Sequence, residues 1–141
     1  HVVNIASLSG KRGDPYNSLY SASKAGLIAW TDALRQELRG MGVGVSLVSP
    51  GPVAAGMFLA HCEQLPPFVR MCPPSDVSKA VIKVIEAGRA EILVNAGLAP
   101  VLYAIAQFSP SLADAIYRWL GIPQMNARTA RDMAGGAPVG D

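Results

Sequence analysis

Three short apolar runs, separated by two segments with helical spacing, constrain the fold of this 141-residue chain most strongly. The runs His1 to Ala6, Val43 to Val48 and Glu91 to Asn95 are β-branched, short and without helical period, so each predicts a strand. The segments from about Asn17 to Arg39 and from Ser75 to Ala87 predict helices. This alternation favours an α/β fold with a parallel sheet, in which right-handed crossovers place the three strands side by side.

Capping residues and glycines mark the ends of the predicted helices. Asn17 or Ser18 can cap the first helix, and Gly40 suits the left-handed position after its end. Ser75 can cap the second helix, which Gly88 is expected to end. Apolar residues at steps of three and four give the first helix one apolar face, formed by Leu27, Trp30, Leu34, Leu38 and Met41.

The remaining segments are predicted from proline, glycine and the loss of periodicity. The run Ser49-Pro50-Gly51-Pro52 is expected to end the second strand, because proline cannot donate to a ladder. Residues 56–74 predict a long loop with a helical turn, and Pro100 to Phe108 and Ser109 to Leu120 predict two short helices. Residues 1–120 then form part of one domain, and residues 121–141 are expected to be a flexible tail.

Composition and charge exclude several classes of protein. With 50% hydrophobic and 16% charged residues, the chain is neither disordered nor a coiled coil. A net charge of +2 with scattered basic residues argues against nucleic-acid binding. Cys62 and Cys72 lack metal-ligand spacing, so no metal site is predicted and a reducing, cytoplasmic compartment is favoured. Apolar stretches are too short for a membrane span.

Four chemically useful features are predicted to meet at one edge of the sheet. Tyr20 and Lys24 lie one turn apart on the first helix. Ser7 follows the first strand, and the turn from Ser49 to Val53 follows the second. Because ligands bind beyond the carboxyl ends of parallel strands, a hydroxyl, a phenol, an ammonium and a rigid turn are expected at one rim. Ser9 competes with Ser7 as the reactive hydroxyl, but a loop serine more often forms a turn.

Proton transfer at a carbinol oxygen is the chemistry that this set of groups suits. A phenol with an ordinary pKa of about 10 is a weak base near neutral pH, and lowering a pKa by about three units takes roughly 4 kcal/mol. An ammonium about 4 Å away contributes roughly 1 kcal/mol in water and about 4 kcal/mol at an effective dielectric constant near 20. The site must therefore be partly closed to solvent. The hydride requires a cofactor, because no protein side chain carries one.

Three motifs in order resemble the later half of the short-chain dehydrogenase/reductase family. They are NIAS at Asn4 to Ser7, YSASK at Tyr20 to Lys24 and SPGPV at Ser49 to Val53. A single YxxxK pattern is weak, whereas the ordered trio is specific. The resemblance covers about residues 1–95, and it implies the carboxyl-terminal portion of a doubly wound, Rossmann-like sheet.

The resemblance implies catalytic roles for three residues of this chain. Tyr20 resembles the catalytic acid/base, and Ser7 the serine that orients the substrate. Lys24 resembles the lysine that favours the tyrosinate and bonds the nicotinamide ribose. Asn4 resembles the strand asparagine, for which a structural role is expected. The implied reaction is the NAD(P)-dependent interconversion of a small-molecule alcohol and a ketone or aldehyde.

Cofactor and substrate contacts are implied in the same way. Pro50 and Gly51 resemble the turn that faces the nicotinamide, and Val53 the residue whose backbone bonds the carboxamide. The segment from about Ala54 to Pro74 resembles the loop that covers the substrate. Apolar residues in that loop, among them Met57, Phe58 and Leu59, suit either an apolar substrate or packing on the sheet.

Two departures limit what the resemblance implies. Ala55 stands where the family often has a threonine that helps to hold the cofactor. The glycine-rich phosphate-binding turn, the residue that selects NAD or NADP and the catalytic asparagine precede, in the family, the point that matches His1. The sequence therefore leaves the choice between NAD and NADP open.

Other functions remain as alternatives. A tyrosine and a lysine on a helix are by themselves more often a half-buried aromatic and its solvated neighbour. The chain could be a non-catalytic dinucleotide- or partner-binding module, an inactive fragment, or a complete small structural protein. We expect the isolated 141 residues to be inactive, because the first strand would expose an apolar edge. In the full-length protein, the resemblance implies a homo-oligomer formed through the long helix.

Overall fold

The computed structural model describes residues 1–56 and 70–133, which contain one parallel three-stranded sheet. The strands are β1 (Val2–Ile5), β2 (Val45–Pro50) and β3 (Glu91–Val94), in the spatial order β1-β2-β3. The predicted α/β fold with neighbouring parallel strands is therefore confirmed. Because the strands are parallel, their carboxyl ends meet at one edge, which is where Ser7 and the Pro-Gly-Pro turn leave the sheet.

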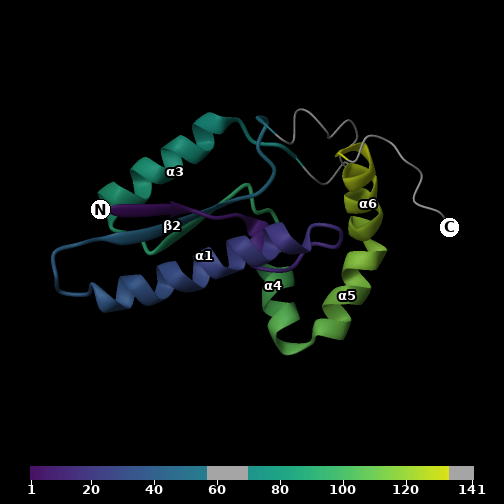
Figure 1. Ribbon diagram of the computed structural model, residues 1–141, viewed down its shortest axis with the longest axis horizontal. Coiled ribbons are helices and arrows are strands. Elements are labelled where there is room, and N and C mark those ends of the chain that lie inside the picture. The colour runs from purple at the N-terminus through teal and green to yellow at the C-terminus, as the bar shows by residue number, and fades with distance from the viewer. Residues whose placement is uncertain (57–69, 134–141) are drawn as a thin grey trace.

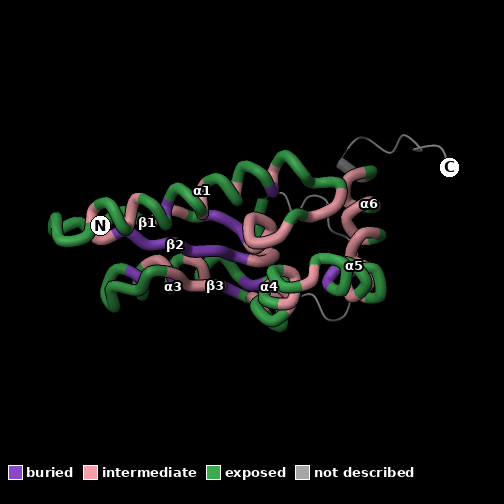
Figure 2. Tube along the Cα trace, turned by 90° about the horizontal axis from the view of Figure 1, so that it is seen from below, coloured by how far each residue is buried: buried purple, intermediate pink, exposed green. Residues whose placement is uncertain are grey.

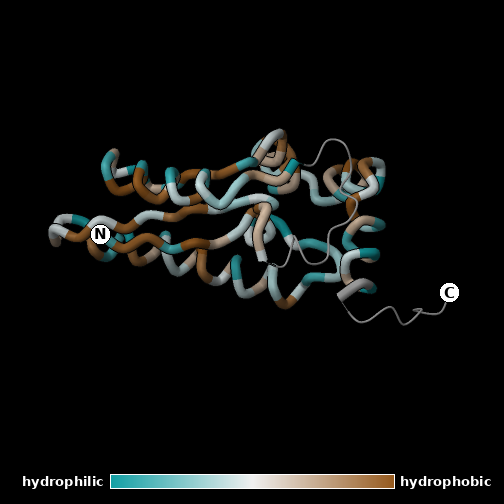
Figure 3. The backbone as a smooth tube through the Cα atoms, turned by 90° about the horizontal axis from the view of Figure 1, so that it is seen from above, coloured by the Kyte–Doolittle hydropathy of each residue, from teal (hydrophilic) through white to brown (hydrophobic). Residues whose placement is uncertain are grey.

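Two helices cover the opposite faces of this sheet. Helix α1 (Ser18–Glu37) lies on one face and α3 (Pro74–Ala87) on the other (Figure 1; Figure 2). The buried hydrophobic core lies between the sheet and α3, and its members are Val48, Cys72, Ala80, Val84 and Val94. Hydrophobic residues run along the strands and recur on the adjoining helices (Figure 3). The sheet and α3 thus form a compact base for the edge that carries the motifs.

The central strand β2 is buried throughout and ends two residues later than the sequence predicts. The prediction that Pro50 cannot extend the ladder is wrong, and the geometry explains why. Leu47 and Gly51 donate their N–H groups to Ala90 and Val94 of the β3 side, at 2.9 Å each. The intervening even-numbered N–H groups face β1, whose last paired residue is Ile5. Pro50 lies beyond that point, so its missing N–H costs no ladder bond.

Helix α1 packs on the sheet around Thr31, at one side of the predicted apolar face: Leu27, Leu34 and Leu38 are half-buried, and Met41 is exposed beyond the helix. Its buried residues are Ser21 and Thr31, whereas Trp30 is 54% exposed. The hydroxyl of Thr31 donates to the carbonyl of Leu27 at 2.6 Å and accepts from the side chain of Asn4 at 2.9 Å. This polar link ties β1 to α1 and gives Asn4 the structural role that was expected.

The helix ends follow the glycines better than the predicted caps. Gly88 has φ 59 and ends α3, as predicted, and Gly40 has φ 84 just beyond α1. The N-terminal predictions are less accurate, because α3 begins at Pro74 rather than after Ser75. Proline suits the first turn, where its missing N–H has no partner to lose. Asn17 precedes α1 without a side-chain capping bond.

Three helices follow the sheet at the end of the molecule opposite the N-terminus (Figure 1). Helices α4 (Ala99–Phe108) and α5 (Pro110–Trp119) confirm the two short helices predicted there. The prediction of a tail without regular structure fails for α6 (Ile122–Met133), which packs on α5; residues 134–141 lie outside the described residues. No helix within the described residues is both long and apolar enough to cross a membrane.

Candidate functional site at the carboxyl edge of the sheet

Ser7 lies where β1 passes into a short 3-10 helix, η1 (Leu8–Gly10). The chain still pairs with the sheet just before this point, because the Ala6 N–H donates to the Val48 carbonyl at 2.9 Å. Ser7 then adopts an extended backbone, and its Oγ accepts the Ser9 N–H at 3.2 Å. The side chain is buried, which excludes most of the solvent that would compete for its hydroxyl. Ser9 therefore acts as a turn donor to Ser7.

Gly10 sets how closely the Ser7 loop approaches helix α1. A Cβ at this position would lie 2.7 Å from the Lys24 carbonyl carbon and 2.9 Å from the Ala25 nitrogen. It would also lie 2.8 Å from the Ile28 side chain. Because backbone atoms of a helix cannot move aside cheaply, only glycine permits this contact. The loop that carries Ser7 is thus seated on the turn of α1 that carries Lys24.

Tyr20 and Lys24 share one face of α1, one helical turn apart. The Lys24 Nζ donates to the carbonyl of Ile5 at 3.1 Å and lies 5.7 Å from the centroid of the Tyr20 ring. Ile5 is the last residue of β1 and precedes Ser7 by two positions. The ammonium is therefore held between the phenol ring and the end of the strand that leads to Ser7.

The Pro-Gly turn after β2 lies against η1 and the end of β3. The Gly51 N–H donates to the Val94 carbonyl at 2.9 Å. A Cβ on Gly51 would lie 2.9 Å from the Asn95 carbonyl oxygen and 3.0 Å from the Leu8 side chain. The turn thus meets the Ser7 loop through Leu8, and glycine is required for that approach.

Just beyond this turn, a β-bridge joins Val53 to the segment that begins again at residue 70. Val53 pairs with Cys72 in parallel, the Cys72 N–H donates to the Pro52 carbonyl at 3.0 Å, and the Ala54 N–H to the Cys72 carbonyl at 2.8 Å. Cys72 is a buried free thiol whose pKa is raised by burial and by the Asp76 carboxylate. The predicted substrate residues Met57, Phe58 and Leu59, and Cys62, lie outside the described residues.

Arg12 joins the Ser7–Tyr20 loop to the C-terminal helices. Its guanidinium pairs with the Asp114 carboxylate and lies 4.3 Å from the centroid of the Tyr117 ring. The Arg12 side chain is only 14% exposed, so its cation–π contact is partly desolvated. Helix α5 thereby holds the middle of the loop that separates the serine from the tyrosine.

Asp14 lies in the same loop and is half-buried. Burial raises the pKa of its carboxyl, while a hydrogen bond with Ser9 and the Arg12 charge act in the opposite direction. The Asp14 N–H donates to the Ser21 hydroxyl at 3.0 Å, which fixes the loop on the first turn of α1. Burial also raises the pKa of Tyr103 on α4 well above its usual range, so this phenol stays protonated.

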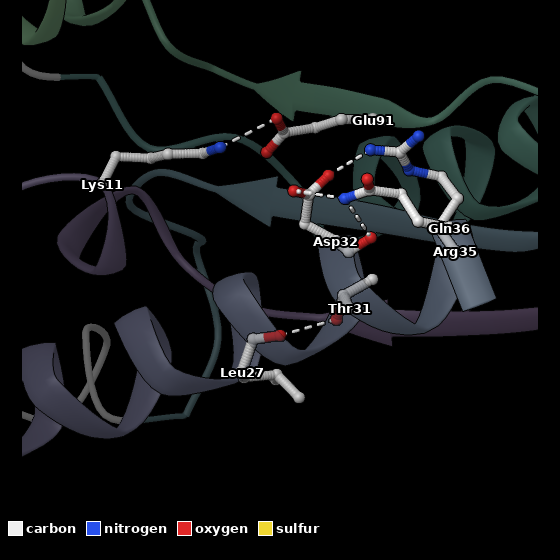
Figure 4. Close-up of polar contacts among 7 residues, drawn as sticks. All are labelled: Lys11, Leu27, Thr31, Asp32, Arg35, Gln36 and Glu91. Carbon is white, nitrogen blue, oxygen red and sulfur yellow. Dashed lines mark hydrogen bonds and ion pairs between the residues drawn. The ribbon is translucent and has the colours of Figure 1, made fainter.

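Two open cavities flank this region, and neither is lined by Ser7, Tyr20 or Lys24 among the described residues. One, of about 330 Å³, lies between residues 9–15 and α1. The other, of about 390 Å³, lies beside β3 and is crossed by polar contacts (Figure 4). There the Lys11 Nζ contacts the Glu91 carboxylate at 2.8 Å, and the Ser49 hydroxyl donates to the same carboxylate at 3.0 Å.

The structure brings the predicted residues that it describes to the carboxyl edge of the sheet. Lys24 and Tyr20 are in contact, and the loops of Ser7 and Gly51 touch through Leu8. Sequence reasoning missed Gly10, Lys11, Arg12 and Asn95, which hold these segments. Of these four residues, only Gly10 could have been noticed in the sequence, because a glycine often marks a place where two backbone segments approach closely. Within the described residues, no three metal-ligating side chains gather.

Comparison with known proteins gives the family. A family profile described as short chain dehydrogenase matches residues 1–65. Ketoacyl reductase HetN of Nostoc sp. (strain PCC 7120) is 44% identical over 137 residues, 93% of this chain and 48% of that protein. An acetoacetyl-CoA reductase of Allochromatium vinosum is 37% identical over 87 residues, 57% of this chain and 35% of that protein. The chain spans about half the length, or less, of these relatives.

The matched profile and these relatives agree with the parallel sheet, its helical layers and the ordered motifs along its edge. The chain is part of a short-chain dehydrogenase/reductase domain and belongs to that family.

Proposed function

We propose that the full-length protein is an NAD(P)-dependent oxidoreductase that interconverts a small-molecule alcohol and a ketone or aldehyde, with Tyr20 as the acid/base. The observation that carries this proposal is the position of the Lys24 Nζ. It is held on the Ile5 carbonyl at 3.1 Å, beside the Tyr20 ring and two residues before Ser7. An ammonium fixed there by the backbone favours the negative charge that a phenol must carry to accept a proton.

Ser7 is proposed to orient the substrate oxygen. Its hydroxyl already accepts the Ser9 N–H, so its own proton is free to be donated to that oxygen. A buried donor aimed at the reacting oxygen stabilises charge there more than an exposed one would. Tyr20 then exchanges a proton with the same oxygen.

The turn from Pro50 to Val53 suits a nicotinamide cofactor, NAD or NADP. Gly51 lets Leu8 and the Asn95 carbonyl pack closely against the turn, which holds it in place, and no described residue accepts a hydrogen bond from the Val53 N–H. The cofactor, when bound, supplies or accepts the hydride. Lys24 would hold its ribose, and the Val53 N–H would bond its carboxamide.

The names of two relatives favour carbonyl reduction over alcohol oxidation. A ketoacyl reductase and an acetoacetyl-CoA reductase are both similar to this chain. We therefore take acetoacetyl-CoA, with NADH or NADPH, as the first assay substrate. A cytoplasmic homo-oligomer is proposed for the full-length protein, in line with the family resemblance.

Replacement of Tyr20 by phenylalanine in the full-length protein tests this function. We expect Tyr20→Phe to lower kcat by roughly 100-fold or more, the scale of a lost general acid, while cofactor affinity stays within about twofold. Tyr16→Phe is the matched control, because Tyr16 is 69% exposed in the same loop region and is expected to keep normal turnover. Unchanged turnover in Tyr20→Phe would contradict the acid/base role of Tyr20, and a wild-type protein that binds cofactor without turnover would favour a binding module.

A further inference from the structure

We propose that Asn95 is a positioning residue that aims the Val53 N–H at the nicotinamide, an inference that rests on the proposed function. Asn95 immediately follows β3 and precedes the C-terminal helices. None of the three motifs contains it. Its side chain nevertheless reaches the turn that those motifs place at the cofactor.

The amide nitrogen of Asn95 links two backbone segments. Nδ2 donates to the Pro52 carbonyl at 3.2 Å and also to the Arg70 carbonyl. Because both acceptors are carbonyl oxygens, only the amide nitrogen can serve, and its two hydrogens supply both bonds. One side chain thus joins the segment that leaves the turn to the segment that returns at Cys72.

The geometry of the peptide bond carries this link to Val53. The Pro52 carbonyl and the Val53 N–H belong to one planar trans peptide, so they point in opposite directions. The carbonyl accepts bonds from Asn95 and, at 3.0 Å, from the Cys72 N–H. Two donors on one oxygen fix the plane, and the Val53 N–H is thereby directed away from both of them.

The bridge to Cys72 supports the same orientation. Both backbone groups of Cys72 bond to the residues that flank Val53, namely Pro52 and Ala54. In a parallel bridge, the groups of the intervening residue face the other way. Among residues 1–56 and 70–133, no acceptor bonds the Val53 N–H.

The backbone of Asn95 is fixed to the same turn. It adopts φ 56, a left-handed conformation that asparagine tolerates better than most residues. Its carbonyl oxygen lies where a Cβ on Gly51 would approach to 2.9 Å. Asn95 therefore contacts the turn through its backbone at Gly51 and through its side chain at Pro52.

Two variants of the full-length protein separate the donor from the backbone conformation. Asn95→Gly keeps the left-handed conformation and removes the side chain. Asn95→Asp keeps the shape and replaces the donor by a carboxylate that faces two carbonyl oxygens. Gln107→Glu, an exposed amide-to-acid change on α4, is the matched control. Each variant is measured for dissociation of NADH and NADPH, kcat with acetoacetyl-CoA, and amide hydrogen exchange without cofactor.

We expect both Asn95 variants to raise the dissociation constant of the preferred dinucleotide by roughly 3- to 10-fold, the scale of one lost hydrogen bond. At saturating cofactor, kcat should fall less than this. Exchange of the Ala54 and Cys72 amides should accelerate without cofactor, because their bridge loses a link. Gln107→Glu should change none of these quantities.

Three outcomes would overturn the inference. If exchange at Ala54 and Cys72 is unchanged, Asn95 does not hold the turn. If exchange accelerates but cofactor affinity is normal, the turn does not aim the Val53 N–H at the cofactor. If the wild-type protein binds neither dinucleotide, the proposed function itself fails, and Asn95 is then only a structural link. The wild-type measurement therefore distinguishes the two failures.

Discussion

The two sides of the carboxyl edge are held in place by different physical means. On the Ser7 side, the loop is fixed by close packing, because Gly10 lies directly on the backbone of Lys24 and Ala25. On the Val53 side, the chain is fixed by hydrogen bonds from Asn95 and Cys72 to a single carbonyl. Gly51, where the Val53 side begins, is closely packed as well, so the difference between the two sides lies in residues 52–54, which hydrogen bonds hold in place.

This difference suits the roles proposed for the two sides. A reacting oxygen must be placed within a few tenths of an ångström of its proton donor, and packing against a helix provides that rigidity. A cofactor enters and leaves, and a turn held by a few hydrogen bonds can adjust at small cost. Substitutions on the Ser7 side should therefore lower kcat, and those on the Val53 side should mainly weaken cofactor binding.

Among these substitutions, Gly10→Ala should have the largest effect on stability and turnover, because it disturbs the close packing on the Ser7 side. The new methyl group would lie under 3.0 Å from two backbone atoms of α1, so the loop or the helix must shift. Overpacking of this kind costs roughly 1–3 kcal/mol of folding free energy, and the displaced Ser7 should lower kcat by about 10-fold or more. Thermal unfolding and steady-state turnover of the full-length protein measure the two effects.

Gly13→Ala provides the matched control for that substitution. Gly13 lies three residues further along the same loop, and a Cβ there meets no atom within 4 Å. We expect normal stability and turnover. Equal behaviour of the two alanine variants would show that close packing at Gly10 does not position the serine loop.

Asp14→Asn should change the free energy of unfolding by a smaller amount. This substitution removes a charge on the Ser7 side and leaves the packing at Gly10 unchanged. Burial raises the pKa of the folded carboxyl above its ordinary value of 3.8, so the folded protein binds the proton more tightly than the unfolded chain does. The wild type therefore loses stability as pH rises from 3.8 through the folded pKa. The variant lacks this loss, so its advantage in unfolding free energy should grow between pH 3 and pH 7.

Urea unfolding of the full-length wild type and variant at the two pH values measures that advantage. A difference that stays constant from pH 3 to pH 7 would mean that Asp14 titrates alike in the folded and unfolded states. If the advantage of the variant became smaller from pH 3 to pH 7, the pKa of Asp14 would be lower in the folded state than in the unfolded state, which would contradict the raised pKa.

The order of strands and helices could be predicted because each element leaves a local signal. Alternating apolar runs and helical segments gave the order of strands, and Gly88 marked a helix end through its left-handed backbone. Helix α6 was missed because it holds few large apolar residues, and its packing on α5 is not visible in the chain order.

The residues that hold the site could not be predicted, because their roles depend on distant partners. Asn95 follows a strand as many turn residues do, and only the fold brings it to Pro52, 43 positions earlier. From the sequence, Arg12 is only a cation in a loop. Its contacts with Tyr117 and Asp114 depend on how α5 packs in the folded chain. The helical spacing placed Trp30 in an apolar face, but the structure leaves this side chain exposed. The fully buried residues of α1 are Ser21 and Thr31, and Thr31 bonds Asn4 of β1.

A double-mutant cycle on Ser7 and Tyr20 in the full-length protein tests most directly whether these groups act at one reacting oxygen. The values of kcat/KM with acetoacetyl-CoA are compared for wild type, Ser7→Ala, Tyr20→Phe and the double variant. We predict that each single change costs roughly 100-fold or more and that the double variant loses little beyond the larger single loss, as for groups that act as a unit. Losses that multiply, or no loss at either position, would contradict a shared site.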